Sequence, residues 1–196
     1  MNSAKVYVVD NGGQWTHREW RVLREIGCDT KIIPTTTPVS EIDADALVLS
    51  GGAPRIAWES PKLGYCTDYL KEFPGPILGI CVGHQIMAVY YGGKAGPSEI
   101  PEYGLSKVRV IEEDDLFKGV PKEFLAWESH NDEVKVTSNF TVLAASENCK
   151  IQAIKHNEKP HYGVQFHPEV NNTEHGSEIL ENFVGIVRAK RKSESL

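Results

Sequence analysis

The chain has 196 residues, of which 40% are hydrophobic and 24% are charged, with 17 glycines and 11 prolines. This composition is typical of globular proteins and excludes the disordered, collagen-like and coiled-coil classes. The formal net charge is −6, from 21 basic and 27 acidic residues, so the chain lacks the basic character of a general nucleic-acid binder. The length favours a single domain with a core of its own.

Signals for export, membrane insertion or disulfide formation are missing from the sequence. Apolar runs such as residues 6–9 and 46–49 are far too short to cross a bilayer, and the first residues do not resemble a signal peptide. We therefore expect a soluble, cytoplasmic protein that contacts no membrane. The four cysteines show no CxxC spacing, which argues against disulfides. A basic cluster at residues 188–192 is expected to be the solvated end of the last helix.

The first half of the chain alternates between short strands and amphipathic helices. Each predicted strand is apolar throughout, which is typical of a strand buried on both faces. The predicted strands cover residues 5–10, 30–34, 45–50 and 76–80, and the predicted helices cover residues 14–27, 61–73 and 82–91. Gly27 is the expected terminator of the first helix. This alternation predicts an α/β fold with a parallel sheet covered by helices on both faces.

After residue 96 the pattern changes to strands separated by short turns. Predicted strands cover residues 105–111, 123–127, 133–137, 141–145 and 151–156. Such a run predicts an antiparallel extension of the parallel sheet. One more strand, at residues 161–166, precedes a final helix. The apolar face of that helix is formed by Ile179, Leu180, Phe183, Val184 and Val187.

The most informative segment is GICVGHQ at residues 79–85, which has the Gly-x-nucleophile-x-Gly form of a sharp turn between a strand and a helix. Larger residues in place of the glycines would collide with the neighbouring strand and helix. A cysteine at position 81 would feel the positive end of the helix dipole, which favours a thiolate. The backbone N–H of Val82 would be free to stabilise an oxyanion. By itself this short pattern also fits a buried cysteine in a glycine-rich turn.

A second segment, GVQFHPE at residues 163–169, places a histidine directly after a predicted strand. Glu169, two residues beyond His167, can orient the imidazole and stabilise its charged form, which completes a Cys–His–Glu triad. Residue patterns alone leave His130 and His84 open as alternative bases. Histidines and acids cluster near residues 161–175, but without HExxH or comparable ligand spacing, so we favour no bound metal.

The third segment is SGGAP at residues 50–54, at the end of a predicted strand. Glycines at a strand end let backbone amides approach a ligand, so the Gly52 N–H is a candidate second oxyanion donor. A simple tight turn explains the same residues. A phosphate-binding loop is disfavoured because no GK[ST] follows.

Together, GICVGHQ, VQFHPEV and LSGGA resemble the nucleophile, His–Glu and oxyanion-strand motifs of class I (triad) glutamine amidotransferases, in the order typical of the family. The similarity covers nearly the whole chain. It implies a three-layer, flavodoxin-like α/β fold, with a mostly parallel central sheet and an antiparallel β extension. We expect residues 1–190 to form one glutamine amidotransferase domain and residues 191–196 to form a C-terminal tail.

The resemblance also implies a role for each matching residue. Cys81 would attack the side-chain amide of glutamine, His167 and Glu169 would move the protons, and the Gly52 and Val82 amides would hold the oxyanion. The residues implied to contact bound glutamine are Gln85, Asn131 and Asp132. Dividing amide hydrolysis into two steps through a thioester lowers each barrier.

Within the family, the chain is most similar to the separate glutaminase subunits of archaeal GMP synthetases, on the segments DNGGQWTHREWRVLRE, AWESHNDEV and HPEVNNTEHG. The resemblance implies no cofactor bound by this chain. It implies a separate synthetase subunit that uses ATP and Mg²⁺ to convert XMP to GMP, because no SGGxDS-type ATP loop occurs here.

Several other interpretations fit parts of the pattern. The closest is the glutaminase subunit of anthranilate or aminodeoxychorismate synthase, which keeps the chemistry and changes the pathway. A γ-glutamyl hydrolase or a related cysteine peptidase is a looser alternative. A non-catalytic regulatory subunit of the same fold is a further one, although pure scaffolding needs no Cys–His–Glu combination.

Overall fold

The structure is a computed structural model that describes residues 3–55 and 64–194. Within these residues one sheet of nine strands forms the centre of the molecule, in the order β2-β1-β3-β4-β9-β8-β7-β5-β6. The parallel half consists of β2 (Ile32–Pro34), β1 (Val6–Asn11), β3 (Ala46–Gly52), β4 (Ile77–Ile80) and β9 (His161–Val164). The antiparallel half consists of β8 (Ala153–His156), β7 (Phe140–Ala145), β5 (Lys94–Val110) and β6 (Glu123–Val136).

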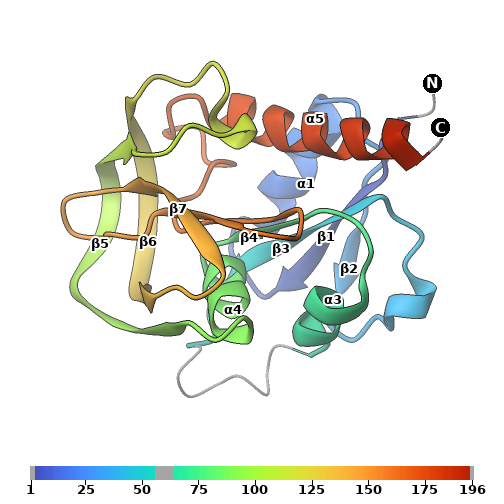
Figure 1. The fold of residues 1–196 in the computed structure, drawn as a ribbon, viewed down its shortest axis with the longest axis horizontal. Coiled ribbons are helices and arrows are strands. Elements are labelled where there is room, and N and C mark those ends of the chain that lie inside the picture. The colour runs from blue at the N-terminus through green and yellow to red at the C-terminus, as the bar shows by residue number, and fades with distance from the viewer. Residues whose placement is uncertain (1–2, 56–63, 195–196) are drawn as a thin grey trace.

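Helices cover both faces of the parallel half, which gives three layers (Figure 1). The helices α1 (Thr16–Glu25) and α5 (Gly176–Glu194) lie on one face, and α3 (Cys66–Glu72) and α4 (Val82–Tyr90) lie on the other. Short 3₁₀ turns, η1 (Val39–Glu41) and η3 (Asp115–Phe117), connect strands. The predicted α/β fold, a parallel sheet with an antiparallel extension, is therefore confirmed.

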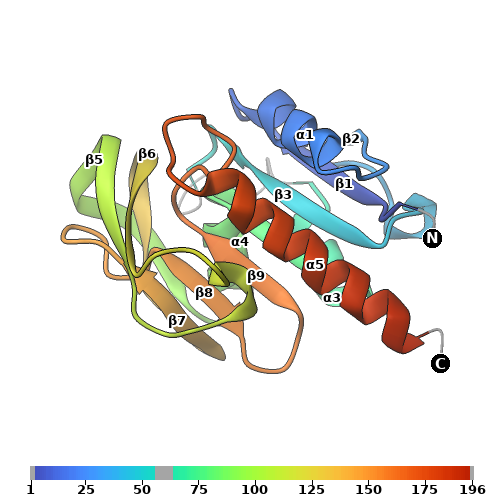
Figure 2. The ribbon, with the colours of Figure 1, turned by 90° about the horizontal axis from the view of Figure 1, so that it is seen from above.

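Alternation along the buried strands produces the two larger of the three hydrophobic clusters in the described residues. In β1, Val6 and Val8 pack with the apolar face of α5, whereas Tyr7 and Val9 pack with α3 and α4. Because successive side chains of a strand point to opposite faces, a continuous apolar run can supply both cores. All five apolar residues predicted for the last helix are fully buried. Viewed from above, α5 lies across the sheet beside α1 (Figure 2).

Most element boundaries agree with the sequence pattern, but two strands are longer than predicted. The segments predicted as 123–127 and 133–137 belong to one strand, β6, and the segment 105–111 is the end of the long strand β5. The residues between the two predicted segments are polar, yet they stay paired with β5, for example Ser129 with Tyr103 and His130 with Glu102. Several of these polar side chains are buried and bind one another beneath the hairpin. The segment therefore lacks the alternation of apolar and polar residues from which a strand is usually predicted.

The other differences concern helix ends. The first helix spans Thr16–Glu25, and Gly27 follows it with φ of +92°, as expected for a glycine terminator. The helix predicted for residues 61–73 includes α3, but its first residues lie outside the described part of the chain.

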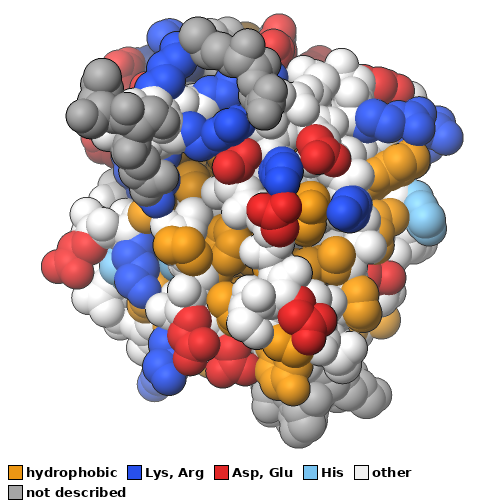
Figure 3. All heavy atoms as spheres, turned by 90° about the vertical axis from the view of Figure 1, so that its right-hand side faces the viewer, with side chains coloured by type: hydrophobic (Ala, Val, Ile, Leu, Met, Phe, Trp, Pro, Cys, Tyr) orange, Lys and Arg blue, Asp and Glu red, His pale blue; other side chains and the backbone are white. Residues whose placement is uncertain are grey.

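The last helix and its basic cluster also differ from expectation. The helix continues to Glu194, so most of the segment expected as a tail is helical. The cluster is not merely solvated, because Arg191 pairs with Asp45 at 3.3 Å and Lys190 donates to the Pro74 carbonyl at 2.7 Å. The side of the molecule that carries the end of α5 mixes acidic, basic and apolar side chains (Figure 3). In the described residues no helix is both long and apolar enough to cross a membrane.

Candidate active site

Cys81 lies in a sharp turn between β4 and α4. Its backbone has φ of 50° and ψ of −103°, which is strained for a residue with a side chain. A Cβ at Gly79 would collide with the backbone of Gly83, and a Cβ at Gly83 would collide with the carbonyl oxygen of Leu49 in β3. Both glycines are thus required by close packing, as the motif predicts. Val82 is the first residue of α4, so its N–H has no acceptor within the helix.

His167 lies in the loop after β9 and borders the same cavity as Cys81. Its Nδ1 donates to Oε1 of Glu169 at 2.7 Å, and the Trp15 ring packs edge-on against the imidazole with centroids 4.5 Å apart. Burial alone would lower the pKa of His167, but the charge of Glu169 and hydrogen bonds to Cys81 and Glu169 raise this pKa well above its ordinary value. With Nδ1 bound to Glu169, Nε2 remains to exchange a proton with the thiol.

The other histidines that the sequence left open as bases are engaged elsewhere. His84 is completely buried in α4, where burial lowers its pKa to about 3, and it borders neither of the cavities beside Cys81. Nε2 of His130 donates to a buried glutamate, Glu102. The geometry therefore favours His167 as the base.

Cys81 borders two cavities. The first, of about 250 Å³, also contains His167 and the glycine-rich ends of β1 and β3; it is lined by Gly12, Gly13, Gln14, Trp15, Glu19, Gly51, Gly52, Ala53, Cys81, Ser129 and His167. The second, of about 300 Å³, contains the three residues expected to bind glutamine; it is lined by Gly52, Ala53, Pro54, Arg55, Cys81, Val82, Gln85, Tyr103, Ser129, His130, Asn131 and Asp132. The Cys81 thiol can therefore contact a substrate in the second cavity while it faces His167 in the first.

The end of β3 passes directly beside the thiol and the imidazole. A Cβ at Gly51 would lie 3.0 Å from Cε1 of His167 and 3.7 Å from Cβ of Cys81, so only glycine fits without displacing the base. Gly52 borders both cavities and Val82 borders the second. The structure therefore places both expected oxyanion donors next to the cavity that would hold the substrate.

The residues expected to contact glutamine differ in how they are held. Asn131 is exposed at the cavity. The carboxylate of Asp132 is bound by the guanidinium of Arg55, whose Nε lies 3.2 Å from both oxygens. The side-chain amide of Gln85 donates to the backbone oxygen of Asp132 at 2.8 Å. Gln85 thus supports the cavity wall, whereas Asn131 remains available to a ligand.

Gln165 and Arg55 are among the polar residues near the thiol that sequence reasoning missed. Gln165 is fully buried and donates from Nε2 to Sγ of Cys81 at 3.5 Å, while its Oε1 accepts from Gln85 at 3.1 Å. A buried polar residue within the apolar run VQF was the available signal. Arg55, which neutralises Asp132, follows the predicted SGGAP turn and carried no motif of its own.

A buried ionic cluster lies beneath the hairpin of β5 and β6. Nε2 of His130 lies 3.1 Å from Glu102 and 3.3 Å from Glu128, and all three side chains are at most 3% exposed. Burial alone would lower the pKa of His130, but hydrogen bonds to Glu102 and Glu128 raise it to about 10. Burial alone would raise the pKa of Glu102, but its hydrogen bonds, to His130 above all, and the charge of His130 together lower this pKa.

This cluster is the group among the described residues whose ligand atoms, all within 4.8 Å of one another, could hold a metal ion. The imidazolium already supplies the positive charge that the two carboxylates need. Absence of a bound metal therefore stays a prediction, and the cluster is explained without one.

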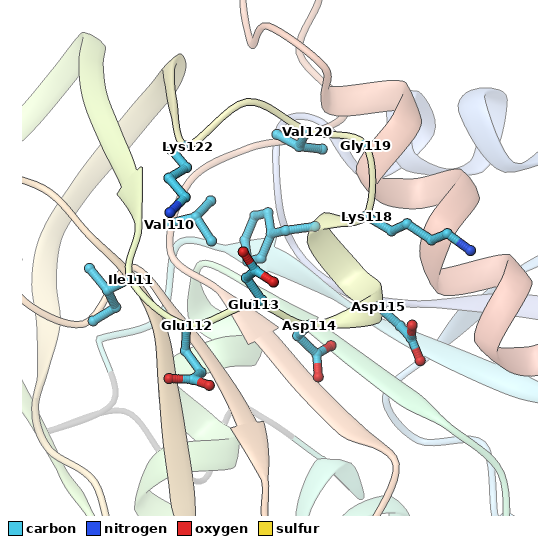
Figure 4. A pocket seen from close by; sticks show the side chains of 11 residues that line it. Val110, Ile111, Glu112, Glu113, Asp114, Asp115, Lys118, Gly119, Val120 and Lys122 are labelled. Carbon is cyan, nitrogen blue, oxygen red and sulfur yellow. The ribbon is translucent and has the colours of Figure 1, made fainter.

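A third cavity, of about 690 Å³, lies away from Cys81, between the end of β5 and η3. Four successive acidic residues, 112–115, border it together with Lys118 and Lys122 (Figure 4). Lys155 pairs with Asp114 there. None of the residues predicted to carry chemistry borders this cavity, so its larger volume does not make it the candidate active site.

Comparisons with known proteins agree with the geometry. The chain matches the family described as glutamine amidotransferase class-I over residues 7–187. A GMP synthase (glutamine-hydrolyzing) subunit of Thermoplasma acidophilum is 50% identical over 190 residues, or 96% of this chain and 95% of that protein. Its counterpart from Pyrococcus abyssi is 51% identical over 185 residues, or 91% of this chain and 96% of that protein.

A solved crystal structure of a Thermoplasma acidophilum protein matches with a TM-score of 0.95 and 47% identity, covering 100% of both chains. The fold, the motifs and the sequence similarity thus agree over the length of the molecule. The chain belongs to the class-I glutamine amidotransferase family.

Proposed function

We propose that this chain is the glutaminase subunit of a two-subunit GMP synthetase. It hydrolyses glutamine to glutamate and ammonia, and the ammonia passes to a separate ATP-dependent subunit that converts XMP to GMP. Two observations support the proposal: the strained cysteine beside a buried His–Glu pair, and about 50% identity to relatives named as one subunit of GMP synthase. Those names indicate a partner subunit, which would bind ATP and Mg²⁺ in the cytoplasm.

The reaction begins when the thiolate of Cys81 attacks the side-chain amide carbon of glutamine. A C–S bond forms, and the carbonyl oxygen becomes an oxyanion that the N–H groups of Gly52 and Val82 stabilise. His167 then donates its Nε2 proton to the amide nitrogen as the C–N bond breaks, so ammonia leaves and a glutamyl thioester remains.

Hydrolysis of the thioester uses the same groups in reverse. Neutral His167 takes a proton from a water molecule, the resulting hydroxide attacks the thioester carbon, and the C–S bond breaks to release glutamate. In both steps Glu169, bound to Nδ1 at 2.7 Å, keeps the imidazole oriented and stabilises its charged form. The second cavity, with Asn131 and the Arg55–Asp132 pair, provides polar groups for the amino-acid end of glutamine.

The test measures glutamate release from glutamine by the chain alone and by the chain mixed with the ATP-dependent GMP-forming subunit, XMP, ATP and Mg²⁺. We expect release with the loaded partner and none from Cys81→Ala, while that mixture still makes GMP from added ammonium salt. Release that the partner does not influence would refute the GMP assignment and keep the glutaminase. No release under any condition would refute both.

A further inference from the structure

A buried glutamate on α1, Glu19, is not part of the Cys81–His167–Glu169 triad. The face of α1 that packs on the sheet consists of Thr16, Glu19 and Leu23, and Glu19 is 1% exposed. Its side chain borders the cavity that contains Cys81 and His167. Among the described residues no basic side chain pairs with it. An ionised carboxylate in such a position is strongly destabilising unless it is neutralised.

The contacts of Glu19 show which of its atoms are used. Oε1 accepts a hydrogen bond from the backbone N–H of Gly51 at 3.3 Å. Oε2 has no hydrogen-bond partner among the described residues, and Oε2 of Glu169 has none either. Burial and the charge of Glu169 raise the pKa of Glu19 well above its ordinary value, and the Gly51 hydrogen bond opposes them only in part. The charged groups that face Glu19 are Glu169, His167 and Asp10.

A neutral carboxylic acid fits this environment. It accepts a hydrogen bond through one oxygen, here from the N–H of Gly51, and can donate through the other. In the neutral form it adds no second negative charge beside Glu169, whose own charge must remain to stabilise the His167 imidazolium.

Glu19 also completes the anchoring of the strand end beside the thiol. The carbonyl of Gly51 accepts from Oγ of Ser50 at 2.8 Å, and its N–H is held by Glu19. With both groups of Gly51 bound, the direction of the next peptide is restricted, and that peptide carries the Gly52 N–H. Without Glu19, the Gly51 N–H would lose a buried acceptor, and rotation of the peptide could carry the oxyanion donor away.

We propose that Glu19 is a positioning residue of the glutaminase reaction, which as a neutral acid fixes the Gly51–Gly52 backbone and adds no second negative charge beside the His167–Glu169 pair. This inference rests on the proposed function. It predicts that the reaction needs a neutral donor–acceptor at position 19, and needs neither a negative charge nor an apolar side chain there.

The experiment compares Glu19→Gln with Glu19→Leu in the complex with the synthetase subunit. Glutamine keeps one acceptor and one donor group, so we expect kcat within about threefold of the unmodified chain and an unchanged pH profile. Leucine has a similar volume but lacks both the acceptor and the donor group. We therefore expect kcat to fall at least about tenfold with KM nearly unchanged, because the loss of a positioned oxyanion donor destabilises the transition state. Glu25→Gln, on the exposed side of the same helix, is the matched control.

A second readout separates this inference from the proposed function. The rate at which iodoacetamide alkylates Cys81, measured against pH, reports the Cys81–His167 pair without glutamine. We expect the profile of Glu19→Gln to follow that of the unmodified chain and the profile of Glu19→Leu to be displaced, while thermal unfolding shows both variants folded. Equal activity of Glu19→Leu and the unmodified chain would overturn the inference, and so would equal loss in both variants. Failure of the unmodified chain to hydrolyse glutamine would instead refute the proposed function.

Discussion

Replacing Glu169 by glutamine is expected to lower kcat for glutamine hydrolysis by about 10²- to 10⁴-fold. The carboxylate lies 2.7 Å from Nδ1 of His167, with side chains 0% and 5% exposed, so water cannot replace it. At an effective dielectric constant near 20, two unit charges at this distance attract by about 6 kcal/mol. Breaking one partner of a buried pair typically costs about 3–5 kcal/mol, which corresponds to about two to four powers of ten in rate.

The assay couples glutamate release to glutamate dehydrogenase in the presence of the loaded synthetase subunit. Glu178→Gln is the control, because Glu178 also binds Nδ1 of a histidine, His175, but on the exposed surface. We expect Glu178→Gln to change the rate by less than about twofold, since exposed ion pairs contribute little. A Glu169→Gln rate within tenfold of the unmodified chain would show that Glu169 does not orient the base.

Three further outcomes follow from the geometry. Because the backbone of Cys81 is strained, the free energy of unfolding should be about 1 kcal/mol higher for Cys81→Gly than for Cys81→Ala. Denaturant titrations measure both values, and equal values would refute the strain. Asp132→Ala should raise KM for glutamine about tenfold with less effect on kcat, because it removes a carboxylate that lines the second cavity and binds Arg55; steady-state kinetics at fixed partner concentration checks this. The pKa of His130 is raised to about 10, above its unfolded value near 6.5, so its stabilisation is complete below about pH 6.5 and is lost as the pH rises through about 10. The free energy of unfolding should therefore fall between pH 7 and 10, and the decrease should be smaller in His130→Asn.

The parallel half of the sheet and the nucleophile turn could be predicted because local pattern and tertiary environment agree there. The run VYVV in β1, residues 6–9, is buried on both faces of the sheet and is therefore apolar throughout. Gly79 and Gly83 are required by contacts within a few residues of Cys81 and by the neighbouring β3. Such requirements leave a short motif in the sequence.

The β5–β6 hairpin and the supporting polar residues could not be predicted in the same way. Glu128 and His130 are buried strand residues, but their stability depends on Glu102, whose position in β5 becomes adjacent only after folding. Glu19 occupies a helix position where an apolar residue is the usual expectation. Its environment is set by Gly51, 32 residues away, and by Glu169, which is more distant still.

The sheet order also affects when the active site can exist during biosynthesis. The last strand of the chain, β9, lies near the centre of the sheet, between β4 and β8, and His167 directly follows it. A nascent chain that carries Cys81 therefore has no base until more than 160 residues have been made and β9 has been inserted beside β4. Fragments that end before residue 167 therefore hold the Cys81 thiol without the imidazole that lies beside the same cavity in the full chain.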